Sequence, residues 1–294
     1  MKMKQPTTYE QQLKLLKSRG CIIDDDQFCI DVLSSVNYYR FSAYFLPFWN
    51  SDRITYKSGT TFSQIYCIYE FDQYLRRIVL SEIENIETSL RAKVVYFHAH
   101  KYGALGYENK SNFNTAHNHS TFKSIIAGEI RKNKNVLFVK HHIAKYNGKL
   151  PIWAMIELFS LGMLSRFYSD LLTGDRKQIA LETFGVDESL VRSWLQCCTN
   201  LRNICAHYGR LYYRLLGAVP LTPKGFGFTL DRSLFSALVM LKLMSRDKIA
   251  WNSTFLLKLQ DLISDYSNSV HLQHIGFPNN WHDLLKHETD QEGG

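Results

Sequence analysis

The sequence lacks the features that would direct the chain into a membrane or into an oxidising compartment. No run approaches the roughly 20 apolar residues that a membrane-spanning helix requires, and the N-terminal MKMKQPTTYE has no apolar core of the signal-peptide kind. The six cysteines form no regular framework and no Cys-x-x-Cys pair, and most stand among apolar neighbours, as buried reduced thiols do. We therefore expect a soluble, cytoplasmic protein with no membrane partner.

Motifs for several kinds of catalysis are also missing. The chain has no Gly-x-x-x-x-Gly-Lys or Gly-x-Gly-x-x-Gly phosphate loop and no Gly-x-Ser-x-Gly nucleophile elbow. Histidines occur in close pairs (His98/His100, His117/His119 and His141/His142), but no His-Glu-x-x-His or thiol pair completes a metal site. We expect neither a metal nor another cofactor.

What the chain does have is apolar bulk and positive charge. With 294 residues, 45% hydrophobic and 14% aromatic, it can bury a sizeable core as one large domain or two closely packed ones. A formal net charge of +8 and a pI near 9.1 fit a polyanionic partner such as RNA. The placement of the charge supports this, because two windows hold no acidic residue.

The first acid-free window lies between Glu188 and Asp231, and the second runs from Ile130 to Ile156. The first contains Arg192, Arg202, His207, Arg210, Arg214 and Lys224, and the second contains Arg131, Lys132, Lys134, Lys140, His141, His142, Lys145 and Lys149. The second window can be a phosphate-contacting surface or an ordinary solvated helix face, and its composition does not decide between them.

Helical periodicity dominates the chain and strand-like alternation is nearly absent, so we predict an all-α fold. The expected helical segments cover residues 7–20, 24–36, 38–49, 61–101, 120–146, 151–172, 175–184, 187–216, 232–247 and 252–268. The segment 61–101 exceeds the usual length of a globular helix and is expected to bend or break once. Its apolar positions step by four and three, as in a bundle seam. They are Leu75, Val79, Ile83, Ile86, Leu90, Val94 and Phe97.

The segments between the helices suggest how the chain is organised. Residues 103–119, rich in Gly, Asn and Ser, are expected to form a loop or a mobile insertion. Residues 217–230 contain two prolines and three glycines and must be a connection, which can include a short extended piece. We expect one domain over residues 1–285, in which residues 1–60 can form a helical subdomain, and a tail at 286–294.

The segment LRNICAHYGR (201–210) is the most informative part of the sequence. On a helix that turns about 100° per residue, Asn203, His207, Arg210 and Arg214 share one face, with Arg202 at its edge. A polar stripe of amide, imidazole and guanidinium groups is typical of a functional site rather than of a solvated surface. Gly209 could end the helix early, which would change the direction of the two later arginines.

The segment RNICAH matches the Arg-Asn-x-x-x-His motif of HEPN-type ribonucleases, and AHYGRLYYR resembles the C-terminal signature of the bacterial abortive-infection (Abi-like) family. Residues 37–48, 68–91 and 150–171 support the same family in order and spacing, so the resemblance covers roughly residues 5–285. It implies a HEPN-like helical bundle and a toxin-like endoribonuclease of anti-phage defence. Such an enzyme would need control by a regulatory RNA or an antitoxin partner.

RNA cleavage without a metal uses the ribose 2′-hydroxyl as nucleophile. Imidazole suits the proton transfers and guanidinium suits the phosphate. The resemblance then implies that His207 is the general acid or base, that Arg202 clamps the scissile phosphate, and that Asn203 bonds the phosphate or holds the imidazole. Because HEPN ribonucleases join two motifs and this chain has one good one, a two-fold homodimer with a composite active site is expected.

Other interpretations remain open for these residues. Arg202 and His207 can be structural, bonding to carbonyls or to the polar stripe Glu84, Glu87, Arg91 and His98 of the segment 61–101. Glu87 and Arg91 can form a local ion pair or support the catalytic helix and its RNA. Arg91 and His98 have the spacing of a second, weaker motif without its asparagine.

Arg210 and Arg214 can contact RNA or a carboxylate on a neighbouring helix. The chief rival to catalysis is a non-catalytic RNA-binding or scaffold protein that uses the same basic cleft, and in it the imidazole would be dispensable. A protein-interaction partner with no RNA role is disfavoured by the two acid-free windows.

Overall fold

The computed structural model describes Met3 and residues 5–288 of the chain. These residues form helices and irregular segments with three isolated β-bridges and no strand, so the all-α prediction is confirmed. The α-helices are α1 (Tyr9–Ser18), α2 (Asp26–Ser35), α3 (Tyr38–Ser42), α4 (Phe62–Tyr102), α5 (His119–Lys132), α6 (Leu137–Tyr146), α7 (Ile152–Met155), α8 (Leu161–Asp170), α9 (Thr173–Phe184), α10 (Glu188–Ala206), α11 (Leu234–Met244), α12 (Lys248–Ala250), α13 (Leu257–Asp265) and α14 (Trp281–Leu285). Short 3-10 helices cover Ala43–Phe48, Gly106–Glu108, Lys110–Asn112, Ile156–Leu158 and Leu272–Ile275, and Trp251–Leu256 is a π-helix.

The long helix α4 is the axis of the fold. It runs unbroken for 41 residues, about 60 Å, from a cap in which Thr61 accepts a hydrogen bond from Gln64 N–H. The expected break is absent because no glycine or proline interrupts residues 62–102, and Gly103, at φ +78°, ends the helix. The predicted seam is buried except at Phe97, where the buried position passes to His98.

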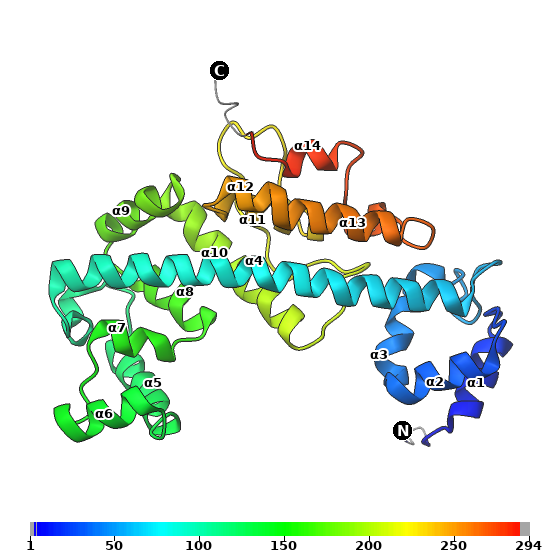
Figure 1. The fold of residues 1–294 in the computed structure, drawn as a ribbon, viewed down its shortest axis with the longest axis horizontal. Coiled ribbons are helices and arrows are strands. Elements are labelled where there is room, and N and C mark those ends of the chain that lie inside the picture. Colours follow the sequence, from blue (N-terminus) through cyan, green and yellow to red (C-terminus); the bar gives the residue numbers. More distant parts are fainter. Residues whose placement is uncertain (1–2, 4, 289–294) are drawn as a thin grey trace.

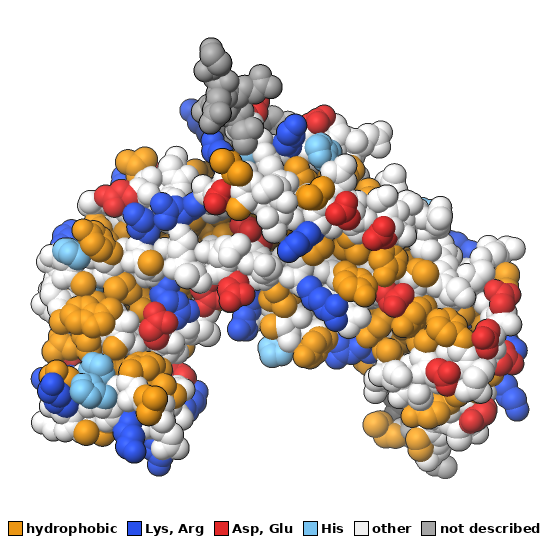
Figure 2. Space-filling model, in the orientation of Figure 1, with side chains coloured by type: hydrophobic (Ala, Val, Ile, Leu, Met, Phe, Trp, Pro, Cys, Tyr) orange, Lys and Arg blue, Asp and Glu red, His pale blue; other side chains and the backbone are white. Residues whose placement is uncertain are grey.

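The other helices are arranged around α4 as an arch. Helices α1 to α3 lie beside its N-terminal end, α5 to α8 lie below its C-terminal end, and α11 to α14 lie along its upper side (Figure 1). Helix α10 packs against α4, α8, α9 and α11, and therefore joins three parts of the molecule. The space-filling view is hollowed on the underside, between the two lower groups of helices (Figure 2).

The segment 103–119, expected to be a loop or a mobile insertion, packs into the core. Tyr107, Phe113 and His117 are buried in it, and two short 3-10 helices shape its backbone. Asn114 N–H donates to Asp170 O at 2.8 Å, which ties the segment to the end of α8. This irregular stretch therefore supports the neighbouring helices.

Two other expectations need correction. The helix expected over 151–172 is interrupted between α7 and α8, where Phe159 has extended backbone. The helix expected over 187–216 ends at Ala206, for the reasons given below. Residues 217–230 form a connection without a helix, as predicted, and Leu216 N–H at its start donates to Arg232 O at 2.8 Å.

Candidate active site

The C-terminal end of α10 is a tightly closed helix terminus. Gly209 N–H donates to Ile204 O at 2.7 Å and Tyr208 N–H donates to Cys205 O at 3.1 Å, which is the Schellman pattern. Tyr208 holds the left-handed position of that motif at φ +58°, where glycine is the usual residue. The apolar periodicity continues beyond this point, but the helix does not.

Gly209 permits the close turn because it lacks a side chain. A Cβ atom at this position would lie 3.0 Å from both the carbonyl oxygen and Cγ2 of Ile204. We expect Gly209→Ala to lower the free energy of unfolding by about 1–3 kcal/mol, the usual effect of overpacking, as measured by urea denaturation. Gly217→Ala is the matched control, because its Cβ meets nothing within 4 Å, and equal losses in both variants would contradict the steric explanation.

A buried carboxylate on α4 anchors the chain beyond this terminus. Asp72, fully buried, accepts hydrogen bonds from Tyr212 N–H at 2.7 Å and from Leu211 N–H at 3.1 Å on Oδ1. Its Oδ2 accepts from Tyr44 Oη at 2.7 Å and from Arg76 Nη1 at 2.5 Å. Burial raises the pKa of Asp72, whereas the Arg76 guanidinium, the Tyr44 hydroxyl and the two backbone N–H groups favour its ionised form.

Two arginines hold the carbonyls of the same turn. Arg40 Nη1, from α3, donates to Tyr208 O at 2.5 Å, and Arg76 Nη1 lies 3.4 Å from Gly209 O. Residues 208–212 are therefore held by side chains of α3 and α4 that lie more than a hundred residues earlier in the sequence. We call this segment the anchored turn. Sequence reasoning missed its anchors, although an Asp72 and Arg76 pair on the apolar seam of a helix is a recognisable signal of a buried polar contact.

The three residues predicted to be catalytic follow one another at the C-terminal end of α10, just before the anchored turn. His207 is the exposed last residue of the helix terminus, Asn203 is exposed one turn earlier, and Arg202 is half-buried. Arg202 Nη1 donates to Asn203 Oδ1 at 3.3 Å, whereas the His207 side chain makes no hydrogen bond within the described residues. This end of α10 lies on the underside of the arch, where Lys, Arg and His side chains are visible together (Figures 1 and 2).

Arg210 and Arg214 do not share a helical face with His207, because the helix ends before them. The Arg210 guanidinium donates to Tyr212 O at 2.7 Å and to Tyr213 O at 3.0 Å, which braces the anchored turn. Burial lowers the pKa of Arg210, yet its carbonyl contacts suit a charged donor. Arg214 is exposed and lies in the irregular segment that follows α10.

The residues of the predicted polar stripe of α4, Glu84, Glu87, Arg91 and His98, lie in two different environments. Arg91 pairs with Glu87 and donates to Ile156 O at 2.7 Å and Phe159 O at 3.1 Å, so it holds the interruption between α7 and α8. A groove of about 810 Å³ is lined by Glu84, Glu87 and Arg91 together with Arg202. The structure thus brings Arg202 to this stripe, but Asn203 and His207 do not line the groove.

His98 does not form a second motif with Arg91. Its ring is fully buried among Tyr102, Phe113 and Phe167, and within the described residues neither ring nitrogen has a hydrogen-bond partner. Burial lowers the pKa of His98 to about 4. The residue is a neutral core side chain with no access to RNA.

His98 should make folding sensitive to acid. The unfolded chain takes up a proton on this histidine below pH ~6.5, whereas the folded state does so only near pH 4, so the free energy of unfolding falls as the pH is lowered through this window. We expect a loss of about 3 kcal/mol between pH 7 and pH 4 that His98→Leu removes. Urea denaturation of both proteins across the window measures the difference, and parallel pH curves would show that His98 is not the cause.

The described residues also contain no cluster of three or more His, Cys, Asp or Glu side chains that could hold a metal ion. None of the helices between residues 5 and 288 has the length and apolar character needed to cross a membrane.

Comparison with known proteins gives one match. The model of the Abi-like protein family matches residues 31–213, well over half of the chain. The matched region begins in α2 and ends in the irregular segment after α10, and so includes Asp72 and the whole anchored turn. No curated protein and no solved structure matches the chain.

Proposed function

The chain belongs to the Abi-like protein family, and we propose that it is a metal-independent endoribonuclease that acts in defence against phage. Membership of the family suggests a role in abortive infection. The observation that carries the more specific proposal is the cluster of Arg202, Asn203 and His207 at the exposed end of α10. In the same proposal, an RNA or an antitoxin partner holds the enzyme inactive until infection.

The chemistry follows from the three side chains. His207 removes the proton of the ribose 2′-hydroxyl or protonates the departing 5′-oxygen, since an imidazole can serve either step near neutral pH. Arg202 offers a fixed fork of donors to the phosphate, and its bond to Asn203 is weak enough at 3.3 Å to be exchanged for one to RNA. The products are a 2′,3′-cyclic phosphate and a 5′-hydroxyl.

One catalytic histidine per chain is too few for both proton transfers. The active enzyme is therefore proposed to be a two-fold homodimer that places two sets of Arg202, Asn203 and His207 in one cleft. Exposed apolar side chains beside the cluster support such an interface. Tyr39 is 88% exposed and Tyr208 is 69% exposed, on segments that Arg40 joins.

The proposal is tested with an end-labelled RNA in EDTA. Wild-type protein is expected to cut it and to leave cyclic phosphate and 5′-hydroxyl ends. A matched RNA with a single 2′-deoxy nucleotide at the cleavage position should resist cutting there, because the nucleophile is missing. A requirement for a divalent metal, or products with 3′-hydroxyl ends, would overturn the mechanism.

A non-catalytic RNA-binding protein is the second candidate, and one contact favours it. The guanidinium of Arg40 lies 5.8 Å from the ring centroid of the exposed Tyr208, so an aromatic face and a cation are presented together beside the cluster. Such a pair suits stacking on an RNA base. In this case intact RNA is bound in a salt-dependent manner, no cyclic phosphate forms, and His207 is dispensable.

A further inference from the structure

A polar groove lies between α8 and the first three turns of α10, beside the segment 114–116. Its volume is about 930 Å³, and its walls carry Arg166 and Ser165 from α8, Arg192, Gln196 and Asn200 from α10, and Thr115. Within the described residues, the side chains of Arg192, Gln196 and Asn200 make no hydrogen bond or ion pair. Their donors and acceptors are therefore available to a ligand that lies in this groove.

The α10 wall of this groove continues into the candidate active site. Arg192, Gln196, Asn200, Asn203 and His207 follow one another at steps of four, four, three and four residues, which keeps them on one face of the helix. The distance along the axis from Arg192 to His207 is ~22 Å. A ligand lying in the groove is therefore directed along α10 toward His207.

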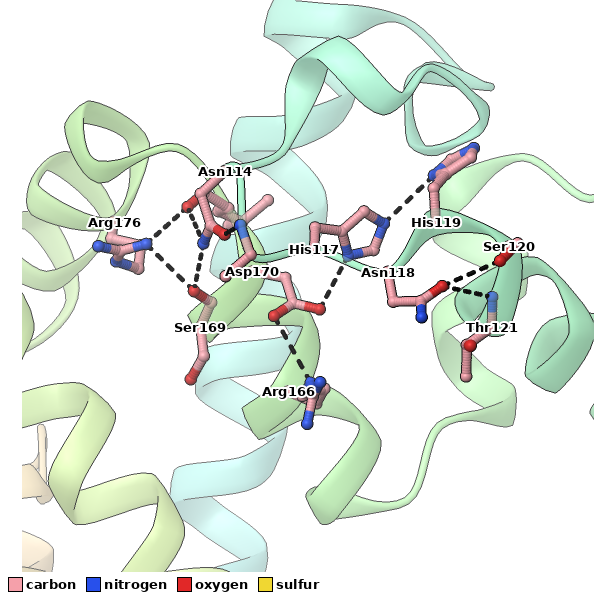
Figure 3. A network of polar contacts seen from close by, with 12 residues as sticks. Asn114, His117, Asn118, His119, Ser120, Thr121, Arg166, Ser169, Asp170 and Arg176 are labelled. Atoms are coloured by element: carbon pink, nitrogen blue, oxygen red, sulfur yellow. Dashed lines mark hydrogen bonds and ion pairs between the residues drawn. The ribbon is translucent and has the colours of Figure 1, made fainter.

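The opposite wall is built rigidly (Figure 3). Asp170 Oδ2 lies 2.8 Å from Nδ1 of the buried His117, whose ring stacks on Phe113 with centroids 4.1 Å apart. Asn114 Nδ2 donates to Ser169 O at 2.9 Å, and so fixes the end of α8 to the segment 114–116. This network holds the α8 side of the groove in place, and the groove-lining side chains that it uses are Asn114, Asp170 and Arg166.

The charge of the groove favours an anion. Its one carboxylate among the described lining residues, Asp170, is already occupied by His117 and by Arg166 Nε at 3.5 Å. The Arg166 side chain is nevertheless 73% exposed, and Arg192 stands exposed across from it. The two guanidinium groups suit phosphates, and the amide and hydroxyl groups between them suit ribose 2′-hydroxyls.

We propose that this groove is the track that binds a single RNA strand and leads it to His207. The inference rests on the proposed function, because it assigns RNA as the substrate of the site at the end of α10. A groove of this volume accommodates a few nucleotides of one strand. Arg166 and Arg192 bind successive phosphates, while Gln196 and Asn200 bond to the riboses or bases.

Binding is measured by fluorescence anisotropy with a single-stranded RNA of about 20 nucleotides, in a His207→Ala background so that nothing is cut. Arg192→Gln is expected to raise Kd about tenfold and to reduce the slope of log K against log salt by about 0.7, which corresponds to one lost phosphate contact. Arg192→Lys should keep most of the affinity. Arg77→Gln, which removes one exposed charge from the other side of α4, is the matched control and should change Kd less than twofold.

The same variants with His207 restored separate the groove from the catalytic proposal. If wild-type protein cuts RNA and the groove variants keep its KM, the groove proposal is overturned while the function stands. If RNA is bound but never cut, and the groove variants weaken binding, the catalytic proposal fails while the groove stands. If Arg77→Gln raised Kd as much as the groove variants, the effect would come from the net charge of the protein, and the groove proposal would be overturned. Failure of the His207→Ala protein, whose groove is intact, to bind RNA at low salt would also overturn it.

Discussion

Replacing His207 with alanine is expected to lower the rate of RNA cleavage by about 10²- to 10⁴-fold while leaving the fold intact, because general acid–base catalysis supplies a factor of that size. The side chain is exposed and makes no hydrogen bond within the described residues, so its removal should change the free energy of unfolding by less than about 0.5 kcal/mol. The rate is measured under single-turnover conditions in EDTA, and stability by urea denaturation.

The matched control for this variant is His100→Ala, an exposed histidine near the C-terminal end of α4, which should cut at the wild-type rate. Expression in a host cell gives a second readout, in which wild type is toxic and His207→Ala is not, at equal protein level. If His207→Ala retained full cleavage or full toxicity, the imidazole would not be the acid or base. The RNA-binding alternative would then take precedence.

Sequence periodicity correctly predicted the helices whose buried residues all lie on one face. The seam of α4 is the clearest case, because Leu75, Val79 and Leu90 are all fully buried against neighbouring helices. The same reasoning failed at its C-terminal end. There the buried position is His98 rather than Phe97, since the segment 103–119 folds back and encloses it.

The end of α10 could be predicted only in part from the local pattern. Leu211 and Tyr212 continue the apolar spacing because they are buried, but an irregular segment buries them as effectively as a helix would. The left-handed Tyr208 carries no local signal, because Arg40 and the anchors on α4 hold it from a distance. Gly209 did indicate an early end, and its role is a close approach to the last helical turn.

The candidate site was predicted in part for a similar reason. The motif placed Asn203 and His207 on one exposed face, and they lie there. Neighbouring residues on a helix point about 100° apart, so Arg202 is directed instead toward the groove of Glu84 and Arg91. RNA bound at His207 must therefore reach over the edge of α10 to meet Arg202, unless the partner of a dimer supplies the second guanidinium.

Replacing Asp72 with alanine is expected to lower the free energy of unfolding by about 3–5 kcal/mol and to abolish RNA cleavage. The change leaves the buried guanidinium of Arg76 without its counter-ion and removes the acceptor for the N–H groups of Leu211 and Tyr212. Urea denaturation measures the loss, and Asp261→Ala on the exposed face of α13 is the matched control. A loss below 1 kcal/mol would contradict the anchoring role.

A double variant separates the two parts of this effect. Asp72→Leu with Arg76→Met removes both buried charges, and such replacements of an ion pair by apolar side chains are often neutral or stabilising. Here the backbone N–H groups of Leu211 and Tyr212 would still lack an acceptor, each at about 1–3 kcal/mol, so the double variant should recover only part of the stability. Cleavage should not recover, because the anchored turn next to His207 remains unheld. Full recovery of stability together with activity would mean that Asp72 serves only to neutralise Arg76, and that the helix terminus holds the site by itself.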